Sequence, residues 1–390
     1  MSPRTYLDYN ATAPLRPQAA EAMAAVLGET GNPSSVHAEG RRALEHVEAA
    51  REKIAGLVNA KARNMIFTSG GTEANMTALT PQAVAPEGTS EAHCFVSAIE
   101  HPSVLCGGRF QPSHVSGIAV GTDGTVDVSS FAAQLEDYRS ANPSVPFMAS
   151  VMLANNETGA IQPVAEIAEL VHGAGGVLHC DAVQAAGKID IDIASLDADM
   201  VTLSAHKIGG PQGVGALVLG TGLGNFSSAL LRGGGQEMRR RAGTENVAGI
   251  AGFGVAAEIA AQDIGDFRRI GELRDELEIR IKSESPDAVI FAERAPRLAN
   301  TSCFAVPGMK AETSVIGLDL EGVAVSAGSA CSSGKVERSH VLDAMGVEPG
   351  LAECAIRVSL GWTSQAANVE QFIAAWGLIH HRFREQRRAA

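Results

Sequence analysis

The sequence predicts an α/β protein in which helices cover both faces of a mostly parallel sheet. Its 390 residues correspond to two or three domains, and 45% hydrophobic with 19% charged residues is the mix of a globular chain with a large core. Short apolar runs recur between residues 65 and 219, and enough chain for a helix or loop separates each run from the next. This alternation is typical of parallel strands joined by crossover helices.

The first predicted element is an amphipathic helix at 36–58, where apolar residues recur at three- and four-residue steps. A strand at 65–68 comes next, followed by Gly70 and Gly71 and by a helix from about Glu73. Apolar runs predict further strands of the same sheet at 93–97, 147–153, 176–180, 200–204 and 215–219.

The sequence changes character near residue 262, where charged helical patterns replace the β/α rhythm. We therefore predict a large domain at 13–262 and a smaller α+β domain made of 1–12 and 263–390. The elements expected in the smaller domain are helices at 263–284 and 368–386 and strands at 300–306 and 356–360.

Composition excludes several classes of protein. With 44 acidic and 31 basic residues the net charge is −13, and such a surface repels phosphate backbones, so no nucleic-acid partner is expected. No run of 18 apolar residues predicts a membrane span, and the N-terminus has no apolar signal region, so the protein is expected in the cytoplasm. Six cysteines without a C-x-x-C pair predict neither a disulfide framework nor a metal site.

Chemistry is expected where strands end, because ligands of open α/β sheets bind beyond the carboxyl ends of the strands. One such place is S-G-G-T-E-A-N at 69–75. Gly70 and Gly71 permit close approach of the backbone to a ligand, Thr72 adds a hydroxyl, and a helix that begins there offers N–H groups to an anion. By itself the segment is equally compatible with an ordinary turn capped by threonine.

Two charged residues end the next buried strands. Asp181, in H-C-D-A-V-Q, needs a cation or a donor, such as the protonated ring nitrogen of a cofactor; an aspartate that caps the next helix is the alternative. Lys207, in S-A-H-K-I-G-G-P, lies among glycines and uncharged residues, where desolvation favours a neutral, nucleophilic amine; a surface lysine is the alternative. An anion-binding loop, a buried acid and a strand-end lysine together fit pyridoxal 5′-phosphate (PLP).

Short motifs follow one another along nearly the whole chain, from Y-L-D-Y-N-A-T-A-P at 6–14 to I-R-V-S-L-G at 356–361. Between these ends lie G-N-P-S-S-V-H at 31–37, S-G-G-T-E-A-N, E-H-P-S-V at 100–104, N-N-E-T-G at 155–159, H-C-D-A-V-Q, S-A-H-K-I-G-G-P, R-A-G-T-E-N at 241–246 and S-A-G-S-A-C-S-S-G at 326–334. With these motifs in this order, the chain resembles the cysteine desulfurases of the NifS/IscS type, in the class V aminotransferase family of fold-type I PLP enzymes.

The resemblance implies a large PLP-binding domain with a mostly parallel seven-stranded sheet and a small α+β domain that carries the loop at 326–340. It implies that Lys207 holds PLP covalently and moves protons, and that Asp181 keeps the pyridine nitrogen protonated. His101 would stack on the ring and assist proton transfer, although as the residue before a proline it is also explained as a turn residue.

The resemblance also assigns the rest of the cofactor and substrate contacts. Gln184 and Asn156 would bind the phenolic oxygen of the ring, while Asn156 could instead only order its loop. Arg357, assisted by Asn32, would bind the substrate carboxylate, with a structural salt bridge as the alternative role for the arginine. The implied phosphate contacts are Gly71, Thr72, Ser204 and His206, and Thr244 from the neighbouring subunit of a homodimer.

Cys331 distinguishes this reaction from others of the family. It lies among small residues and glycines, which favour an exposed loop, and a thiol there can become a reactive thiolate; an incidental loop cysteine is the alternative. The other five cysteines lie in apolar or strand-like contexts and are expected to be inert.

The implied activity is conversion of L-cysteine to L-alanine, with the sulfur held as a persulfide on Cys331 and passed to an acceptor protein such as an iron–sulfur cluster scaffold. The alternatives are a selenocysteine lyase or a class V aminotransferase. A non-catalytic partner-binding protein of the same fold would have no use for Lys207 and Cys331. The chain ends soon after its last predicted helix, whereas housekeeping members of the family carry a longer tail that contacts the scaffold, and this leaves the identity of the acceptor open.

Overall fold

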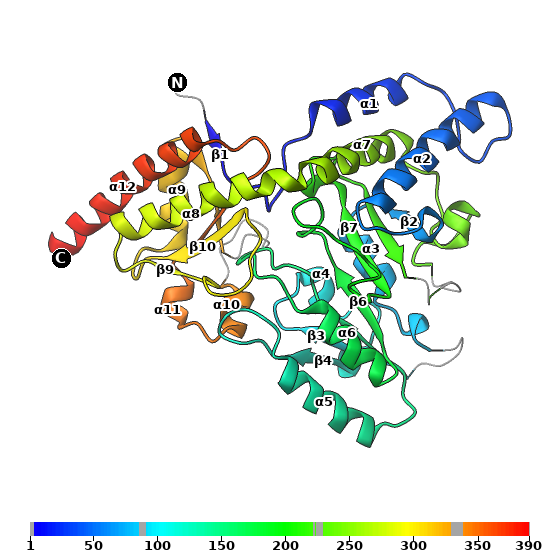
Figure 1. Ribbon diagram of the computed structural model, residues 1–390, viewed down its shortest axis with the longest axis horizontal. Helices are drawn as coiled ribbons and strands as arrows, with labels where there is room; N and C mark the ends of the chain where they lie inside the picture. Colours follow the sequence, from blue (N-terminus) through cyan, green and yellow to red (C-terminus); the bar gives the residue numbers. More distant parts are fainter. Residues whose placement is uncertain (1–3, 86–90, 221–222, 224–228, 329–337, 390) are drawn as a thin grey trace.

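The computed structural model describes residues 4–85, 91–220, 223, 229–328 and 338–389 (Figure 1). Its main feature is a seven-stranded sheet with the strand order β2-β8-β7-β6-β5-β3-β4. All neighbours pair in parallel except β8, which is antiparallel to both β2 and β7. The strands are β2 (Met65–Thr68), β3 (His93–Ser97), β4 (Val115–Ile118), β5 (Phe147–Ser150), β6 (Val177–Asp181), β7 (Met200–Ser204) and β8 (Gly215–Leu219). The predicted α/β class and mostly parallel sheet are confirmed.

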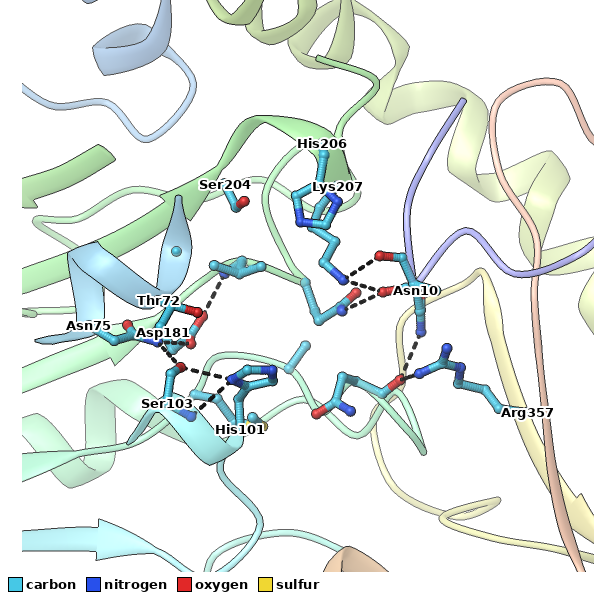
Figure 2. Close-up of a pocket in the computed structure, with 17 residues that line it drawn as sticks. Asn10, Thr72, Asn75, His101, Ser103, Asp181, Ser204, His206, Lys207 and Arg357 are labelled. Atoms are coloured by element: carbon cyan, nitrogen blue, oxygen red, sulfur yellow. Dashed lines mark hydrogen bonds between the residues drawn. The ribbon is translucent and has the colours of Figure 1, made fainter. Parts of the chain in front are cut away.

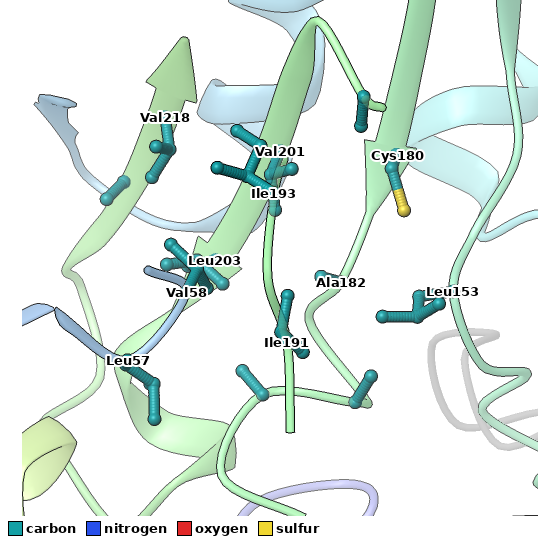
Figure 3. Packing of buried hydrophobic residues seen from close by; sticks show 14 of the residues in the cluster. Leu57, Val58, Leu153, Cys180, Ala182, Ile191, Ile193, Val201, Leu203 and Val218 are labelled. Carbon is teal, nitrogen blue, oxygen red and sulfur yellow. The ribbon is translucent and has the colours of Figure 1, made fainter. Parts of the chain in front are cut away.

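Both faces of this sheet are buried, as expected when helices cover a parallel sheet on both sides. Alternate strand residues contribute to two separate hydrophobic clusters: Met65 and Phe67 face one, and Ile66 faces the other. Figure 3 shows part of the first cluster, where Val201, Leu203 and Val218 meet loops from other parts of the chain. The helices of this part of the chain are α1 (Pro17–Leu27), α2 (Ala38–Gly56), α3 (Gly71–Ala78), α4 (Pro102–Leu105), α5 (Val128–Ala141), α6 (Val164–Gly173) and α7 (Val247–Asp263).

The C-terminal third forms a second α+β unit with a hydrophobic cluster of its own, which includes Phe304 and Trp376. Leu7 belongs to this cluster, and β1 (Thr5–Tyr6) pairs in parallel with β11 (Val323–Ala324), so the first residues of the chain join the C-terminal unit. The division at residues 12 and 262 stays a prediction. The remaining elements are α8 (Phe267–Glu284), β9 (Val289–Ile290), β10 (Thr301–Ala305), α9 (Ala311–Leu320), β12 (Ser326–Ala327), α10 (His340–Ala344), α11 (Pro349–Ala352), β13 (Ala355–Ser359) and α12 (Ala366–Ala389).

The helices α7 and α8 follow each other almost without a break, as Figure 1 shows. The helical stretch Val247–Glu284 is long and apolar enough to cross a membrane, but buried core helices of globular proteins have the same length and composition. Here α7 packs against α1 and α2, and nine of its residues are buried. This packing explains its apolar composition.

Candidate active site

The ends of four strands bring the predicted site residues to one edge of the sheet. In the strand register Thr68 pairs with Gly215, and Gly215 pairs with Ser204, while Asp181 pairs with Thr202 on the other side of β7. A cavity of about 260 Å³ lies at this edge (Figure 2). Ten of the predicted site residues line it: Gly71, Thr72, His101, Asn156, Asp181, Gln184, Ser204, His206, Lys207 and Arg357.

One end of the cavity is the N-terminus of α3, which begins at Gly71. The preceding Gly70 has a φ of 157°, and a Cβ on Gly215 would lie only 2.5 Å from the Gly70 carbonyl carbon. Glycines at both positions therefore let β8 and the turn approach closely. The first turn of α3 has N–H groups without helical partners, and Thr72 lines the same end, so this part of the cavity suits an anionic group such as a phosphate.

The turn before α3 is fixed by Glu73. Its carboxylate accepts a hydrogen bond from the Ser69 N–H (2.7 Å) and pairs with Arg241, whose Nε lies 2.9 Å from Oε1. The pKa of Glu73 is held below its ordinary value by these bonds, against the effect of burial. Arg241 opens the motif that contains Thr244, so the pair connects two of the sequence motifs within one chain.

Asp181 is the last residue of β6 and is 5% exposed. Its Oδ1 accepts the Val183 N–H (2.9 Å), and its Oδ2 accepts the Asn75 Nδ2 (2.8 Å). Both oxygens thus accept hydrogen bonds from neighbouring donors. The bond to Val183 also orders the turn after β6, so the structural role considered for Asp181 coexists with its position in the cavity.

We expect Asp181→Asn to lower kcat/KM by roughly 10²-fold, the usual cost of removing one preorganised charge from an active site. The amide has nearly the shape of the carboxylate, but it removes the negative charge, and its NH₂ group must face the Val183 N–H or the Asn75 amide. Steady-state kinetics with a thermal unfolding curve of the cofactor-free protein measure the effect. Asp190→Asn, at an exposed aspartate, controls for the charge change; a variant with more than a third of wild-type activity would contradict the assignment.

Lys207 follows β7 in a single 3₁₀ turn, Ala205–Lys207, and points into the cavity (Figure 2). Its Nζ donates to the carbonyl oxygens of Asn10 (2.5 Å) and Ala11 (2.8 Å). The amine therefore lies inside the site and does not extend to the surface. Beside it, burial and the charge of Lys207 lower the pKa of His206 to about 4, so this imidazole is neutral at physiological pH.

His101 precedes α4 and caps it: its Nδ1 accepts the Ser103 N–H (3.1 Å). The proton of the neutral imidazole is therefore on Nε2. Burial lowers the pKa of His101, the positive charges of Lys207 and His340 act in the same direction, and Asp181 opposes them. The turn-residue role and the position in the cavity are both realised.

Arg357 reaches the cavity from β13 of the C-terminal unit and is 2% exposed. Its Nη2 donates to Asp8 Oδ1 (2.7 Å) and its Nη1 to the Asn156 carbonyl (2.9 Å). Asp8 also accepts the hydroxyl of Ser326 (2.7 Å). The salt bridge considered as an alternative thus exists, and it orients a guanidinium that lines the site.

Several polar atoms at the cavity have no protein partner among the described residues. Asn75 Oδ1, Asn156 Oδ1 and Arg357 Nε are buried and make no hydrogen bond, although buried polar atoms in folded proteins are normally paired. These unpaired atoms show that the cavity suits a polar ligand. The N-terminus of α3 fits a phosphate, the Asp181 carboxylate fits a protonated ring nitrogen, and Lys207 fits a carbonyl carbon. The fold and this set of residues define the class: a lysine-dependent PLP enzyme of fold type I.

Two predicted residues that the structure describes lie away from the cavity. Asn32 is exposed, and its Oδ1 accepts the Ser34 N–H (2.9 Å); Thr244 is exposed as well, so the single chain brings neither to the cavity. Cys331 lies outside the described residues.

The other five cysteines differ from one another in exposure. Burial raises the pKa of four of them, as expected for inert thiols: Cys94, Cys180, Cys303 and Cys354. The expectation of an apolar context was wrong for Cys106, which is exposed just after α4.

Four residues that organise the site have no role predicted from the sequence: Asp8, Asn10, Asn75 and Ser103. Each lies inside one of the motifs that the chain shares with the cysteine desulfurases. Asn75 Nδ2, for example, connects Asp181 to the Ser103 hydroxyl (2.9 Å), which in turn lies 2.8 Å from His101 Nδ1. The motifs therefore pointed to the right segments of the chain. They did not reveal the hydrogen-bond partners of each side chain, because these partners lie on segments far apart in sequence.

Glu157 is a fifth such residue, buried beside Arg357. Its Oε2 accepts the hydroxyl of Ser339 (2.5 Å), and a Cβ on Gly328 would lie 3.5 Å from the same oxygen. Gly328 and Ser339 flank the segment that contains Cys331. Burial raises the pKa of Glu157 to about 7, against the bond from Ser339 and the charge of Arg357.

This shift predicts a pH-dependent stability. The folded protein binds the Glu157 proton more tightly than the unfolded chain, whose pKa is 4.5, so the contribution of this group is fully present below pH 4.5 and is lost as the pH rises to 7. Glu157→Gln keeps an oxygen for Ser339 and cannot ionise. We expect it to be about 1–3 kcal/mol more stable than wild type at pH 8 and nearly equal to it at pH 5.

Urea unfolding of both proteins at pH 5 and pH 8 measures this difference. Glu169→Gln, at an exposed glutamate of α6, is the control and should show no such pH dependence. A stability difference between Glu157→Gln and wild type that is the same at both pH values would contradict the raised pKa.

Comparison with known proteins agrees with this class. A family model described as Aminotransferase class-V matches residues 5–372. A cysteine desulfurase of Cereibacter sphaeroides is 43% identical over 376 residues, 95% of this chain and 94% of that protein. The cysteine desulfurase IscS of Dictyoglomus turgidum is 40% identical over 371 residues, 93% of this chain and 90% of that protein. The structure of a NifS-like protein from Rickettsia africae matches with a TM-score of 0.86 and 34% identity, over 97% of this chain and 99% of that one.

The chain therefore belongs to the class V aminotransferase family. It is similar over nearly its full length to cysteine desulfurases of the NifS/IscS type, which confirms the resemblance seen in its motifs.

Proposed function

We propose that the protein is a PLP-dependent cysteine desulfurase, which converts L-cysteine to L-alanine and carries the sulfur as a persulfide on Cys331. The observation that carries this proposal is the cavity: a lysine, a donor-held carboxylate and an anion-binding helix end meet at one sheet edge of a chain that matches cysteine desulfurases almost throughout. When bound, PLP provides an electron sink for the substrate carbon that loses a bond.

The described residues have distinct tasks in this reaction. Arg357, already oriented by Asp8, binds the substrate carboxylate. Lys207 holds the cofactor and transfers the proton at the substrate Cα. His101, with its ring proton on Nε2, can donate a proton inside the cavity.

The sulfur step uses the thiolate of Cys331. It attacks the sulfur of bound cysteine, so that an S–S bond forms on Cys331 while the C–S bond breaks. The electron pair of the broken bond stays on carbon, which takes up a proton to give alanine. A thiol reductant or an acceptor protein then removes the outer sulfur.

The test is to incubate the holoenzyme with L-cysteine and a thiol reductant and to measure alanine and sulfide together. We expect equal amounts of both, with no requirement for a 2-oxo acid. Alanine formed only when a 2-oxo acid is present would favour an aminotransferase. Turnover of L-selenocysteine with strong discrimination against L-cysteine would favour a selenocysteine lyase.

Three finer properties belong to the same proposal. The acceptor is an iron–sulfur cluster scaffold, supported by the similarity to a desulfurase named IscS. The protein is a homodimer in which Thr244 contacts the phosphate in the partner's cavity; the exposure of Thr244, and of Val36 and Met238 as large apolar side chains, supports this. Its compartment is the cytoplasm, where reducing conditions keep a thiol carrier active.

A further inference from the structure

A second lysine is buried directly behind the cavity. Lys188 lies in the turn after β6 and is 6% exposed. Its Nζ donates to Gln184 Oε1 (3.1 Å) and to Asn10 Oδ1 (3.3 Å). The charged groups that act on it are two further cations, Lys207 and Arg357, and with burial they lower its pKa to about 7. No ion pair between described residues includes Lys188. A buried amine without an acidic partner is costly, so its presence calls for a compensating role.

The hydrogen bonds of Lys188 and Asn10 fix the orientation of the Gln184 side-chain amide. In its charged form Lys188 has only donors, so the atom of Gln184 that faces it is the amide oxygen. A backbone carbonyl only accepts, so the atom of Gln184 that faces the Asn10 carbonyl is its nitrogen, at 3.0 Å. Both neighbours thus enforce the same orientation of the amide. Because its oxygen is occupied by Lys188, the group that Gln184 can offer to the cavity is an N–H donor.

Asn10 links Lys188 to Lys207, the lysine inside the cavity, because both lysines donate hydrogen bonds to it. Asn10 Oδ1 accepts Lys188 and Asn300 Nδ2 (3.0 Å), which leaves the Asn10 Nδ2 for the hydroxyl of Thr301 (2.9 Å). The Asn10 carbonyl accepts both Gln184 and Lys207. Removal of the Lys188 amine would therefore take one hydrogen-bond donor from each of two side-chain amides, those of Gln184 and Asn10, and the Asn10 backbone carbonyl also accepts Lys207.

We propose that Lys188 is a positioning residue for the cofactor: it occupies Gln184 Oε1, keeps the Gln184 N–H directed at the phenolic oxygen of PLP, and adds positive charge behind that oxygen. The proposal rests on PLP as the cofactor and is independent of which sulfur or amino-group reaction follows. Lys188 itself is not among the described residues that line the cavity, so its role is to position Gln184.

The test is Lys188→Met, which keeps the length of the side chain without its donors. Cofactor-free protein is titrated with PLP, and binding is followed by visible absorption without substrate. We expect PLP to bind about tenfold more weakly or worse, the effect of losing one hydrogen bond to a charged group. The thermal midpoint of the cofactor-free protein should change little, because removal of a buried amine that has no acidic partner offsets the loss of its two hydrogen bonds. Lys61→Met, at an exposed lysine, controls for the charge change.

Two further variants separate positioning from a structural role. In the background of Gln184→Leu, Lys188→Met should have little additional effect on PLP affinity, since Lys188 acts through Gln184. Lys188→Gln retains a neutral N–H donor and should recover at least half of the lost affinity on a logarithmic scale; if Lys188→Met does not fold, this variant carries the same comparison. Normal PLP affinity with a lowered thermal midpoint in Lys188→Met would overturn the proposal, and so would an undiminished effect in the Gln184→Leu background.

These readouts do not depend on desulfuration. A protein that releases no sulfide from cysteine, but loses PLP affinity on Lys188→Met, would refute the proposed function and support the role of Lys188. Normal sulfide release by the wild type, with unchanged PLP affinity in Lys188→Met, would support the proposed function and refute the role of Lys188.

Discussion

Lys207→Ala is expected to lose at least about 10⁴-fold in the rate of alanine and sulfide formation, since it removes both the covalent holder of the cofactor and the group that transfers the Cα proton. Lys207 is the one lysine among the described residues that line the cavity. Lys188 is not a lining residue, and its Nζ is bonded to Gln184 and Asn10. Product formation at saturating L-cysteine and PLP measures the loss.

A second variant distinguishes chemistry from charge. Lys207→Arg keeps a cation near the carbonyls of Asn10 and Ala11, but a guanidinium neither attacks a carbonyl carbon nor releases a proton at neutral pH. We expect it to be as inactive as Lys207→Ala, and both variants should lose PLP on gel filtration. Activity above about 1% of wild type in either variant would contradict the assignment of Lys207. Unfolding of the cofactor-free proteins shows whether the fold persists without the two hydrogen bonds.

Cys331→Ala is expected to reduce sulfide release from L-cysteine by at least about 10³-fold while the protein still binds PLP with an unchanged visible spectrum. The nucleophile that takes the sulfur is lost, and no described cysteine lines the cavity. Simultaneous loss of alanine is expected, because in this reaction the C–S bond breaks only when sulfur is transferred.

The matched control is Cys106→Ala. Cys106 is the exposed thiol among the cysteines that the structure describes, and its substitution should leave both products unchanged. If Cys331→Ala keeps full activity, the persulfide mechanism is wrong, and a selenocysteine lyase or an aminotransferase becomes the better interpretation. If Cys106→Ala is the inactive variant, the carrier thiol has been assigned to the wrong residue.

Most strands could be predicted from the sequence because each is an apolar run buried on both faces. β7, for example, was expected at 200–204 and spans Met200–Ser204. β4 was not predicted, because Val115–Ile118 contains Ser116 and Gly117 and lies at the sheet edge, where half-exposed residues replace a continuous apolar run. α1 was not predicted either. In Pro17–Leu27 alanines lie on nearly every face of the helix, so the apolar residues show no helical periodicity.

Some residues of the candidate site could likewise be predicted from the sequence, and others could not. Side chains such as Asp181 and Lys207 could be found from sequence because a charged residue at the end of a buried strand is unusual, and the register of β6, β7 and β8 then brings strand ends together. Asn10 and Asn75 could not be given roles, since an amide reveals its function only through its partners. Those partners are distant: Asn75 bonds to Asp181, 106 residues away.

The sequence by itself determined the class of the protein, with its fold and its cofactor, because the motifs that resemble the cysteine desulfurases are short runs of residue types that can be read along the chain. Only the tertiary structure decided how these groups are held. It placed Asp8 against Arg357, Asn10 against Lys207, and Lys188 against Gln184. These contacts depend on burial and on donor–acceptor matching between segments far apart in sequence, and such matching exists only once the N-terminal segment, the large sheet and the C-terminal unit have packed together.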